Sequence, residues 1–241
     1  MRVRLGYVAI ALNIPKTTSS SNVTYTHYKK LATEEEQLEK LKTKTLSNLN
    51  NLYKILNYNV ENKIHFYRIT SALVPLATHP EVDNWNYRLI FKKVPPEIGS
   101  RLMIENDDKT FTATETLALF KTLKLPMVLD VHHHNCNNKG EKIEDLLEEI
   151  MATWDNKHLP PKFHFSSPKE GPLDRKHSDF IVAEDFISFI ETCKKYDRDI
   201  DVMIEAKQKD LALFKLMEDL KRLRQNWTYI DNTTFEVTGS R

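Results

Sequence analysis

Residues 128–136 read VLDVHHHNC, an apolar run that ends on Asp130 and is followed by His132, His133 and His134. A short apolar run that stops on polar residues is typical of a buried strand. A strand with a carboxylate and imidazoles at its end can present metal ligands there, because both groups suit Mn²⁺, Zn²⁺ or Fe²⁺. The prediction of a metal site depends on whether other strands end in the same way.

Three more apolar segments end on residues of the same kind. RLMIE ends on Glu105, KFH on His164 and DVMIE on Glu205, and His177 follows in the loop after KFH. A single glutamate at a strand end is usually a solvated residue, and a triple histidine can be an exposed polar loop. Repetition over four strands favours a metal site, and carboxylates that can bridge ions suit a cluster that cleaves a phosphodiester. We expect one or two of the three adjacent imidazoles to bind metal.

Helical segments separate these strands. The expected helices cover about 33–59, 112–123, 141–152 and 183–195. The first has leucine and isoleucine at three- and four-residue spacing, which predicts an amphipathic helix whose apolar stripe is core. The second begins at Thr112 or Thr114, with Glu115 in its first turn.

The expected strands alternate with these helices. They cover residues 2–10, 64–70, 101–106, 126–131, 162–166 and 199–206. Apolar strands that alternate with helices predict a parallel sheet. In a parallel α/β barrel the carboxyl ends of the strands meet on one face, where active sites form. This arrangement would bring the strand-end ligands together.

The composition is that of an ordinary globular protein, with 40% hydrophobic and 29% charged residues and a formal net charge of +1. Such a charge neither requires nor excludes a polyanionic partner. Cys136 and Cys193 lack a Cys-x-x-Cys spacing, so we expect a cytoplasmic protein with neither a disulfide framework nor a thiolate zinc site. The chain has only five glycines and no glycine-rich phosphate-binding loop.

The first segment, MRVRLGYVAIAL, has the charges and the apolar run of a signal peptide, but no small-residue cleavage site follows it. We interpret it as a first buried strand. No apolar stretch approaches the roughly 20 residues that cross a bilayer, so we expect no membrane role.

Seven segments in order resemble the bacterial ultraviolet damage endonuclease family, relatives of endonuclease IV in the TIM-barrel class. They are LGYVAIAL, YRITSALVPLATHP, RLMIENDDKTFT, VLDVHHHNC, PKFHFSSP, RKHSDFI and VMIEAKQKDLAL. The resemblance implies an α/β fold with a TIM-barrel-type parallel (β/α) barrel over 1–214, followed by a C-terminal helix and tail over 215–241. It also implies a monomer that nicks damaged double-stranded DNA 5′ to pyrimidine dimers and 6-4 photoproducts. The cofactor would be a divalent metal cluster, with Mn²⁺ first and Zn²⁺ or Mg²⁺ as alternatives, and the product a 3′-hydroxyl.

The matching motifs also imply roles for individual residues. The implied metal ligands are Glu105, Asp130, His133, His164, His177 and Glu205, of which Glu105 and Glu205 also count as catalytic. Lys162 resembles a catalytic lysine that can be carbamylated beside the metals, although it could instead be a strand-edge lysine that reaches water.

Three residues resemble members of the DNA-facing surface. Tyr7 could equally pack in the core, and Arg68 could contact a phosphate or form an ion pair. The third is His79 in ATHP. The remaining histidines, His27, His65 and His158, are interpreted as ordinary surface or core residues.

The sequence departs from the family between ATHP and IEND. The family has two further βα units there, with an M-H-P-x-Q-aromatic motif and an L-H-x-G-G motif. Two such units would need roughly 60 residues. In this chain, only the segment EVDNWNYRLIFKKVPPEIGS lies between ATHP and the predicted strand RLMIEN. Two histidine ligands and the pair that probes the damaged bases are therefore missing, and the barrel is expected to be incomplete, with about six strands. Asn84, Trp85 and Tyr87 are candidates to replace the probe.

Three origins of the short interval stay open: an internal deletion, a segment omitted from the sequence, or a divergent member whose site is completed otherwise. A six-strand remnant would close into a smaller barrel or leave an open edge. The remaining ligands could hold one or two ions.

Two other functions stay open beside a metal-dependent damage endonuclease. One is a sugar-isomerase-like metal barrel, which also gathers Glu, Asp and His at strand ends. The other is a non-catalytic remnant that binds metal or damaged DNA. The basic segment MEDLKRLRQNW, with Lys221 and Arg222, is expected to cover a barrel edge or, less favoured, to contact phosphate.

Overall fold

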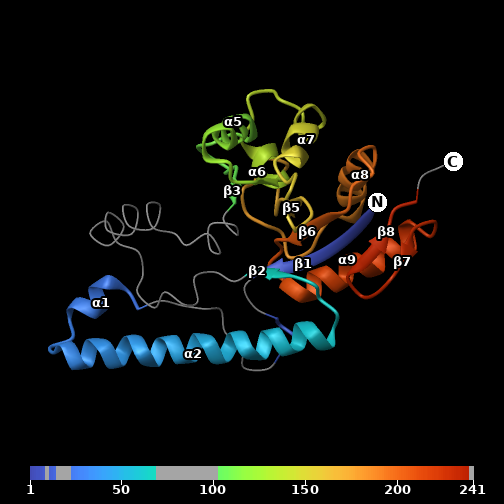
Figure 1. The fold of residues 1–241 in the computed structure, drawn as a ribbon. Coiled ribbons are helices and arrows are strands. Elements are labelled where there is room, and N and C mark those ends of the chain that lie inside the picture. The colour runs from blue at the N-terminus through green and yellow to red at the C-terminus, as the bar shows by residue number, and fades with distance from the viewer. Residues whose placement is uncertain (9–10, 15–22, 69–102, 239–241) are drawn as a thin grey trace. The chain divides into compact units, whose positions relative to one another are not determined.

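A computed structural model describes residues 1–8, 11–14, 23–68 and 103–238 (Figure 1). The strands are β1 (Arg2–Val8), β2 (Tyr67–Arg68), β3 (Ile104–Glu105), β4 (Met127–Asp130), β5 (Lys162–Phe165), β6 (Ile200–Ile204), β7 (Thr228–Tyr229) and β8 (Thr234–Glu236). The helices are α1 (Tyr25–Lys29), α2 (Glu34–Glu61), α5 (Ala113–Leu123), α6 (Val131–Cys136), α7 (Ile143–Ala152), α8 (Ala183–Lys194) and α9 (Lys209–Leu223). The chain forms two compact units, of which the first contains Met1–Asn13, Asn59–Arg68 and Met103–Arg241.

Six parallel strands of the first unit follow one another in barrel order. β1 pairs in parallel with β2 on one side and with β6 on the other, and the pairing continues from β6 through β5 and β4 to β3. The first and last of the six strands are therefore neighbours, as they are in a (β/α) barrel. In the part of the chain that the structure describes, β2 and β3 are not paired, so the sheet is open there. The prediction of an incomplete parallel barrel with about six strands is confirmed.

Two short antiparallel strands extend the sheet in a way that the sequence did not predict. β8 pairs with the first half of β1, in the register Val3↔Phe235, and β7 pairs with β8. The ring of Trp227 stacks on that of Phe235, with centroids 5.0 Å apart, and both rings are buried. The predicted division at residue 214 falls within α9, and the residues after it belong to the same compact unit as β1.

The outer helices cover the barrel strands with apolar side chains. Phe163 and Phe165 of β5 contact Phe189 of α8, with ring centroids 5.3 Å and 5.7 Å apart. All five residues of β6 and all four of β4 are buried, which is expected for parallel strands covered on both faces. The expected start of α5 is confirmed as well, since Thr112 and Glu115 form a reciprocal capping box.

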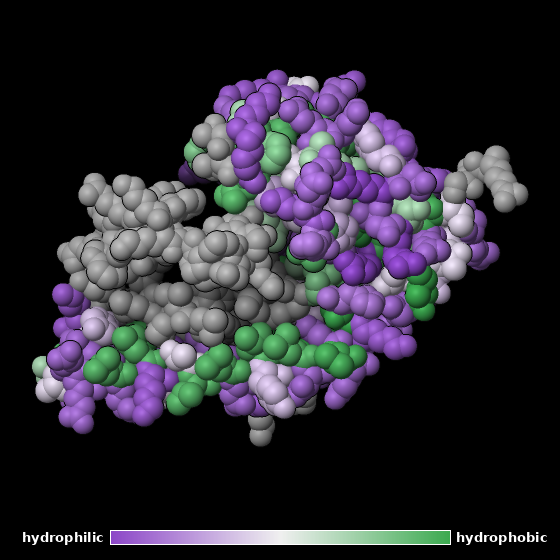
Figure 2. All heavy atoms as spheres, viewed as in Figure 1, coloured by the Kyte–Doolittle hydropathy of each residue, from purple (hydrophilic) through white to green (hydrophobic). Residues whose placement is uncertain are grey.

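The predicted extent of helix α2 is confirmed, but the prediction of which face is buried is not fully met. Leu38, Leu46 and Leu56 are exposed, and Figure 2 shows apolar residues along the visible side of this helix. The buried positions are Asn48, Asn51, Ile55 and Asn59. The assignment to the core is therefore wrong for the exposed leucines of the stripe, and it is confirmed for Ile55. Helical periodicity predicts the helix, whereas the face that becomes buried depends on what packs against it.

No helix among the described residues is long and apolar enough to span a bilayer.

Gly6 allows β1 and β2 to approach each other closely. A Cβ atom at this position would lie 2.6 Å from Cε2 and 2.8 Å from the carbonyl oxygen of Phe66. The ring could rotate away, but the carbonyl oxygen belongs to the backbone and can move only if the chain at β2 moves. Any side chain at position 6 would therefore disturb the β1–β2 pairing.

We predict that Gly6→Ala lowers the free energy of unfolding by about 1–3 kcal/mol, the usual cost of overpacking. Gly171→Ala is the matched control, because no atom lies within 4 Å of its added Cβ, and it should stay within about 0.5 kcal/mol of the parent. Urea unfolding of the three proteins measures both changes. Equal stability of the two variants would contradict the close approach at Gly6.

Candidate metal centre

Four strands bring carboxylates and imidazoles to one place in the first unit. Glu105 ends β3, Asp130 ends β4, His164 lies in β5, and Glu205 directly follows β6. Parallel pairing aligns these ends: Asp130 is opposite His164 in the register, and the Glu205 amide donates to the carbonyl of Phe165 at 3.0 Å. The predicted meeting of the strand-end residues is thus present in the structure.

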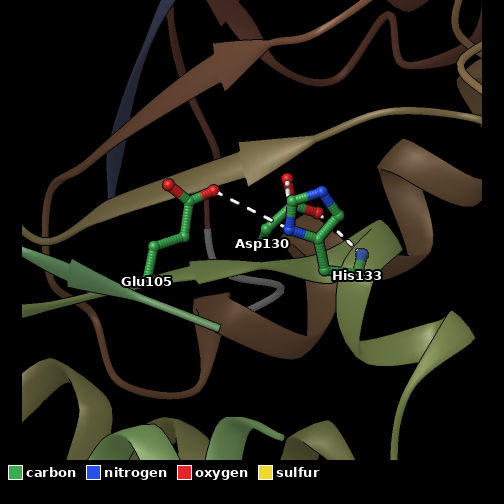
Figure 3. Close-up of side chains that lie close together, drawn as sticks. All are labelled: Glu105, Asp130 and His133. Atoms are coloured by element: carbon green, nitrogen blue, oxygen red, sulfur yellow. Dashed lines mark hydrogen bonds and ion pairs between the residues drawn. The ribbon is translucent and has the colours of Figure 1, made fainter. Parts of the chain in front are cut away.

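These residues form two overlapping groups of possible metal ligands. Glu105, Asp130 and His133 make one group, and Asp130, His164 and Glu205 make the other. Within each group the ligand atoms lie within 4.8 Å of one another. Figure 3 shows the side chains of the first group pointing toward one another from β3, β4 and α6. Asp130 belongs to both groups, so a single carboxylate links them.

His164 lies among three carboxylates. Its Nδ1 is 2.7 Å from Oε1 of Glu105, 3.3 Å from Oε1 of Glu205 and 4.0 Å from Oδ2 of Asp130. Burial lowers the pKa of His164, but the hydrogen bond that His164 donates to Glu105 and the nearby negative charges outweigh burial and raise the pKa above its ordinary value. The imidazolium form therefore balances part of the negative charge of this cluster.

Asp130 has one carboxylate oxygen engaged and one open. Oδ1 accepts a hydrogen bond from the backbone N–H of His133 at 2.9 Å and caps helix α6. Oδ2 is buried without a hydrogen-bond partner. Burial raises the pKa of Asp130, although His133 and His164 oppose this. Nδ1 of His133 lies 3.6 Å from this oxygen, too far for a hydrogen bond. A buried carboxylate oxygen that accepts no hydrogen bond is costly, and a divalent cation would satisfy it. The donor set of carboxylates and imidazoles also fits such an ion.

The three adjacent histidines have three different surroundings. They lie in the short helix α6, so an exposed polar loop is wrong for this segment. His133 belongs to the first ligand group. His132 is buried, with its ring centroid 5.3 Å from that of His177. His134 is buried too, and its Nε2 lies 3.2 Å from the carbonyl oxygen of Glu141.

His177 lies beside the two groups without belonging to either. Its ring centroid is 6.4 Å from that of His133. Burial lowers the pKa of His177, while the charges of Glu205 and Asp130 act in the opposite direction. Its role as a ligand stays a prediction.

Lys162 lies inside the sheet, two residues before His164, and not at a solvated edge. Its Nζ forms an ion pair with the buried carboxylate of Asp201 and lies 4.5 Å from the centre of the Phe66 ring. Asp201 also accepts from Nε of Arg4 at 2.7 Å. The alternative that Lys162 reaches water is therefore wrong, because only 14% of its side chain is exposed.

Asn106 is a site residue that the sequence analysis missed. It is 1% exposed, and its side chain forms two hydrogen bonds with the backbone of Asp130. Its carbonyl oxygen lies 2.9 Å from Nδ1 of His133. Its position in the motif IEND, directly after the predicted ligand Glu105, is the one sequence feature that could have identified it.

Of the predicted DNA-facing residues, the described part of the chain includes the side chain of Tyr7. Tyr7 is fully buried and its hydroxyl donates to Oδ1 of Asn59 at 2.6 Å, which favours the core-packing interpretation. His79, Asn84, Trp85, Tyr87 and the side chain of Arg68 lie outside the described residues. Of the other histidines, His27 and His158 are exposed, and His65 pairs with Asp231 at 2.9 Å.

Comparison with known proteins identifies similar chains. The family model for UV-endonuclease UvdE matches residues 3–100 and 86–232. The UV DNA damage endonucleases of Bacillus cereus and Bacillus mycoides are 29% and 31% identical to this chain, over 93% of it and 96% of each relative. The crystal structure of SacUVDE aligns with a TM-score of 0.66 at 21% identity, covering 92% of this chain and 99% of that one. This last likeness concerns the fold.

The same comparisons bear on the short interval between β2 and β3. The alignments extend over 306 positions, although the chain has only 241 residues. The two matched ranges of the family model overlap at 86–100. The relatives therefore contain residues that this chain lacks, and the junction of the two matches falls in the predicted short interval.

We predict that Glu105→Gln lowers the pKa of His164 in the metal-free protein, because burial remains while the closest carboxylate loses its charge. A raised pKa means tighter proton binding in the folded state. The stabilisation from this tighter proton binding is complete below the pKa of His164 in the unfolded chain, about 6.5. It is lost as the pH rises through the pKa of His164 in the folded protein. Glu105→Gln should remove this part of the pH dependence of unfolding. NMR titration of the His164 ring measures the pKa, and an unchanged value would contradict the pairing.

Proposed function

The chain belongs to the UV-endonuclease UvdE family, and on that premise we propose that it is a divalent-metal-dependent DNA endonuclease that acts on ultraviolet damage. The observation that carries the proposal is the pair of ligand groups joined through Asp130. Its Oδ2 is buried without a hydrogen-bond partner in a partly buried cluster of carboxylates and imidazoles. The names of the relatives supply the substrate.

The proposed metal-holding residues are Glu105, Asp130, His133, His164 and Glu205, with His177 as a further ligand beside them. Mn²⁺ is the first candidate because the family resemblance implies it, with Zn²⁺ and Mg²⁺ as alternatives. Mixed oxygen and nitrogen donors suit both Mn²⁺ and Zn²⁺. When bound, such ions supply a Lewis acid that activates water and stabilises the leaving oxygen.

The protein's own groups would prepare this chemistry in two ways. The carboxylates of Glu105 and Glu205 supply negative charge that attracts a cation. His164 must release its Nδ1 proton before this nitrogen can bind the ion. Lys162 forms an ion pair with Asp201 two residues before His164 in β5, and we propose that its ammonium group contributes to attracting a phosphate.

The proposed reaction is hydrolysis of one phosphodiester on the 5′ side of a pyrimidine dimer or a 6-4 photoproduct. A water oxygen forms a bond to phosphorus, and the bond from phosphorus to the 3′ oxygen breaks. The 3′ oxygen takes up a proton and becomes a hydroxyl, while the phosphate stays on the 5′ end of the other fragment. We propose that a monomer performs this reaction in the cytoplasm.

The short interval limits the proposed activity. The two histidine ligands and the base-probing pair that the resemblance implies are absent from the sequence. The remaining ligand groups leave room for one or two ions. Extrusion of a distorted dinucleotide costs less than extrusion of paired bases, but without the probe selectivity should be low. We expect slow incision and at most a few-fold preference in binding for irradiated DNA.

We predict that Glu205→Gln reduces Mn²⁺-dependent nicking of a duplex with one thymine dimer by at least about 100-fold, since even the loss of an outer partner of a metal ligand costs 10–100-fold. The control is Glu144→Gln, an exposed carboxylate on α7, which should nick like the parent. The assay measures product against time with Mn²⁺ and with EDTA.

Two outcomes would contradict the proposed function. Nicking that survives EDTA and Glu205→Gln would place the chemistry elsewhere. A parent protein that binds Mn²⁺ but nicks no DNA would favour the non-catalytic remnant.

A further inference from the structure

Asn106 extends the pairing of β3 and β4 beyond the last backbone pair. The β3–β4 ladder ends at Glu105↔Val128. Beyond it, Nδ2 of Asn106 donates to the carbonyl oxygen of Asp130 at 3.0 Å, and the Asp130 amide donates to Oδ1 of Asn106 at 2.9 Å. A side-chain amide thus takes the place of a backbone unit and fixes Asp130 by two hydrogen bonds.

The backbone of Asn106 holds a second ligand. Its carbonyl oxygen lies 2.9 Å from Nδ1 of His133, and since a carbonyl can only accept, Nδ1 must carry the proton in this contact. The nitrogen of His133 that could bind an ion is then Nε2. Asp130 in turn accepts from the His133 amide through Oδ1. Asn106, Asp130 and His133 therefore form one closed hydrogen-bond network, and Glu105 is the residue directly before it.

The chemistry of this position calls for asparagine. Aspartate has the same shape but lacks the donor that the Asp130 carbonyl needs. Leucine also branches at Cγ and has the same number of side-chain heavy atoms, although it is bulkier, and it forms no hydrogen bond. Because the position is almost completely buried, loss of the amide would leave the Asp130 backbone N–H without its acceptor and without access to water.

We propose that Asn106 is the positioning residue of the metal centre, which sets the geometry of Asp130 and His133 before an ion binds. This inference rests on the proposed function, since it requires these residues to be metal ligands. Asn106 itself donates no ligand atom in it. Partners that orient metal ligands typically change metal affinity 10–100-fold when they are removed.

The test compares Asn106→Leu and Asn106→Ala with the control Asn59→Leu. Asn59 is also buried, but it bonds to the hydroxyl of Tyr7 and not to a metal ligand. Two measurements use the metal alone: the Mn²⁺ dissociation constant by calorimetry, and the visible absorption of the protein saturated with Co²⁺, which reports coordination geometry. Thermal unfolding shows the temperature range in which every variant is folded.

We expect both Asn106 variants to bind Mn²⁺ at least about tenfold more weakly and to show a changed Co²⁺ spectrum at saturation. Leucine should be no better than alanine, because it restores volume without hydrogen bonds. Asn59→Leu should lower the unfolding temperature while keeping the metal affinity and the spectrum of the parent.

Three results would overturn the inference. If Asn106→Leu keeps the parental affinity and spectrum, the residue only fills space. If affinity falls but the saturated spectrum is unchanged, Asn106 acts on stability and does not position ligands. If the parent binds neither Mn²⁺ nor Co²⁺, the proposed metal centre fails, and the inference fails with it.

Discussion

The parallel register of β3, β4, β5 and β6 is the constraint on which the metal centre depends. Side chains alternate between the two faces of a strand, so a slip of one residue would move every ligand of that strand to the other face. The register that pairs Asp130 with His164 keeps both side chains at the centre. The pairing of β6 with β1 then places Arg4 opposite Asp201, and Asp201 in turn holds Lys162. Backbone pairing thus fixes the positions of the ligands and of the charged residues Arg4, Asp201 and Lys162.

The charges of the cluster partly balance one another before an ion binds. The three carboxylates that lie within 4.0 Å of Nδ1 of His164 repel one another, and burial makes the charged form of Asp130 costly. A raised pKa lets His164 carry a proton among them, and this positive charge takes the place of part of a cation. An arriving divalent ion would displace the proton, so metal affinity and pH are coupled through this residue.

The sequence predicted the parts of the molecule that depend on local pattern. The six barrel strands are apolar runs, their ends carry Glu105, Asp130, His164 and Glu205, and the capping box at Thr112 is a local signal. Contacts that join distant segments could not be predicted, because no local pattern encodes them. They are the hydrogen bonds of Asn106 to Asp130, the ion pair of Lys162 with Asp201, and the pairing of β8 with β1. The preference for aspartate at helix N-caps could have predicted α6 after Asp130. The apolar run before Asp130 is the stronger local pattern, and it predicts only the strand.

The most direct test of the account is anomalous diffraction from crystals grown with Mn²⁺, with data collected above the manganese absorption edge. The account predicts one or two strong peaks beside Asp130, within coordination distance of ligand atoms from Glu105, His133, His164 or Glu205. Manganese that binds the protein in solution but gives peaks only away from Asp130 would contradict the proposed centre.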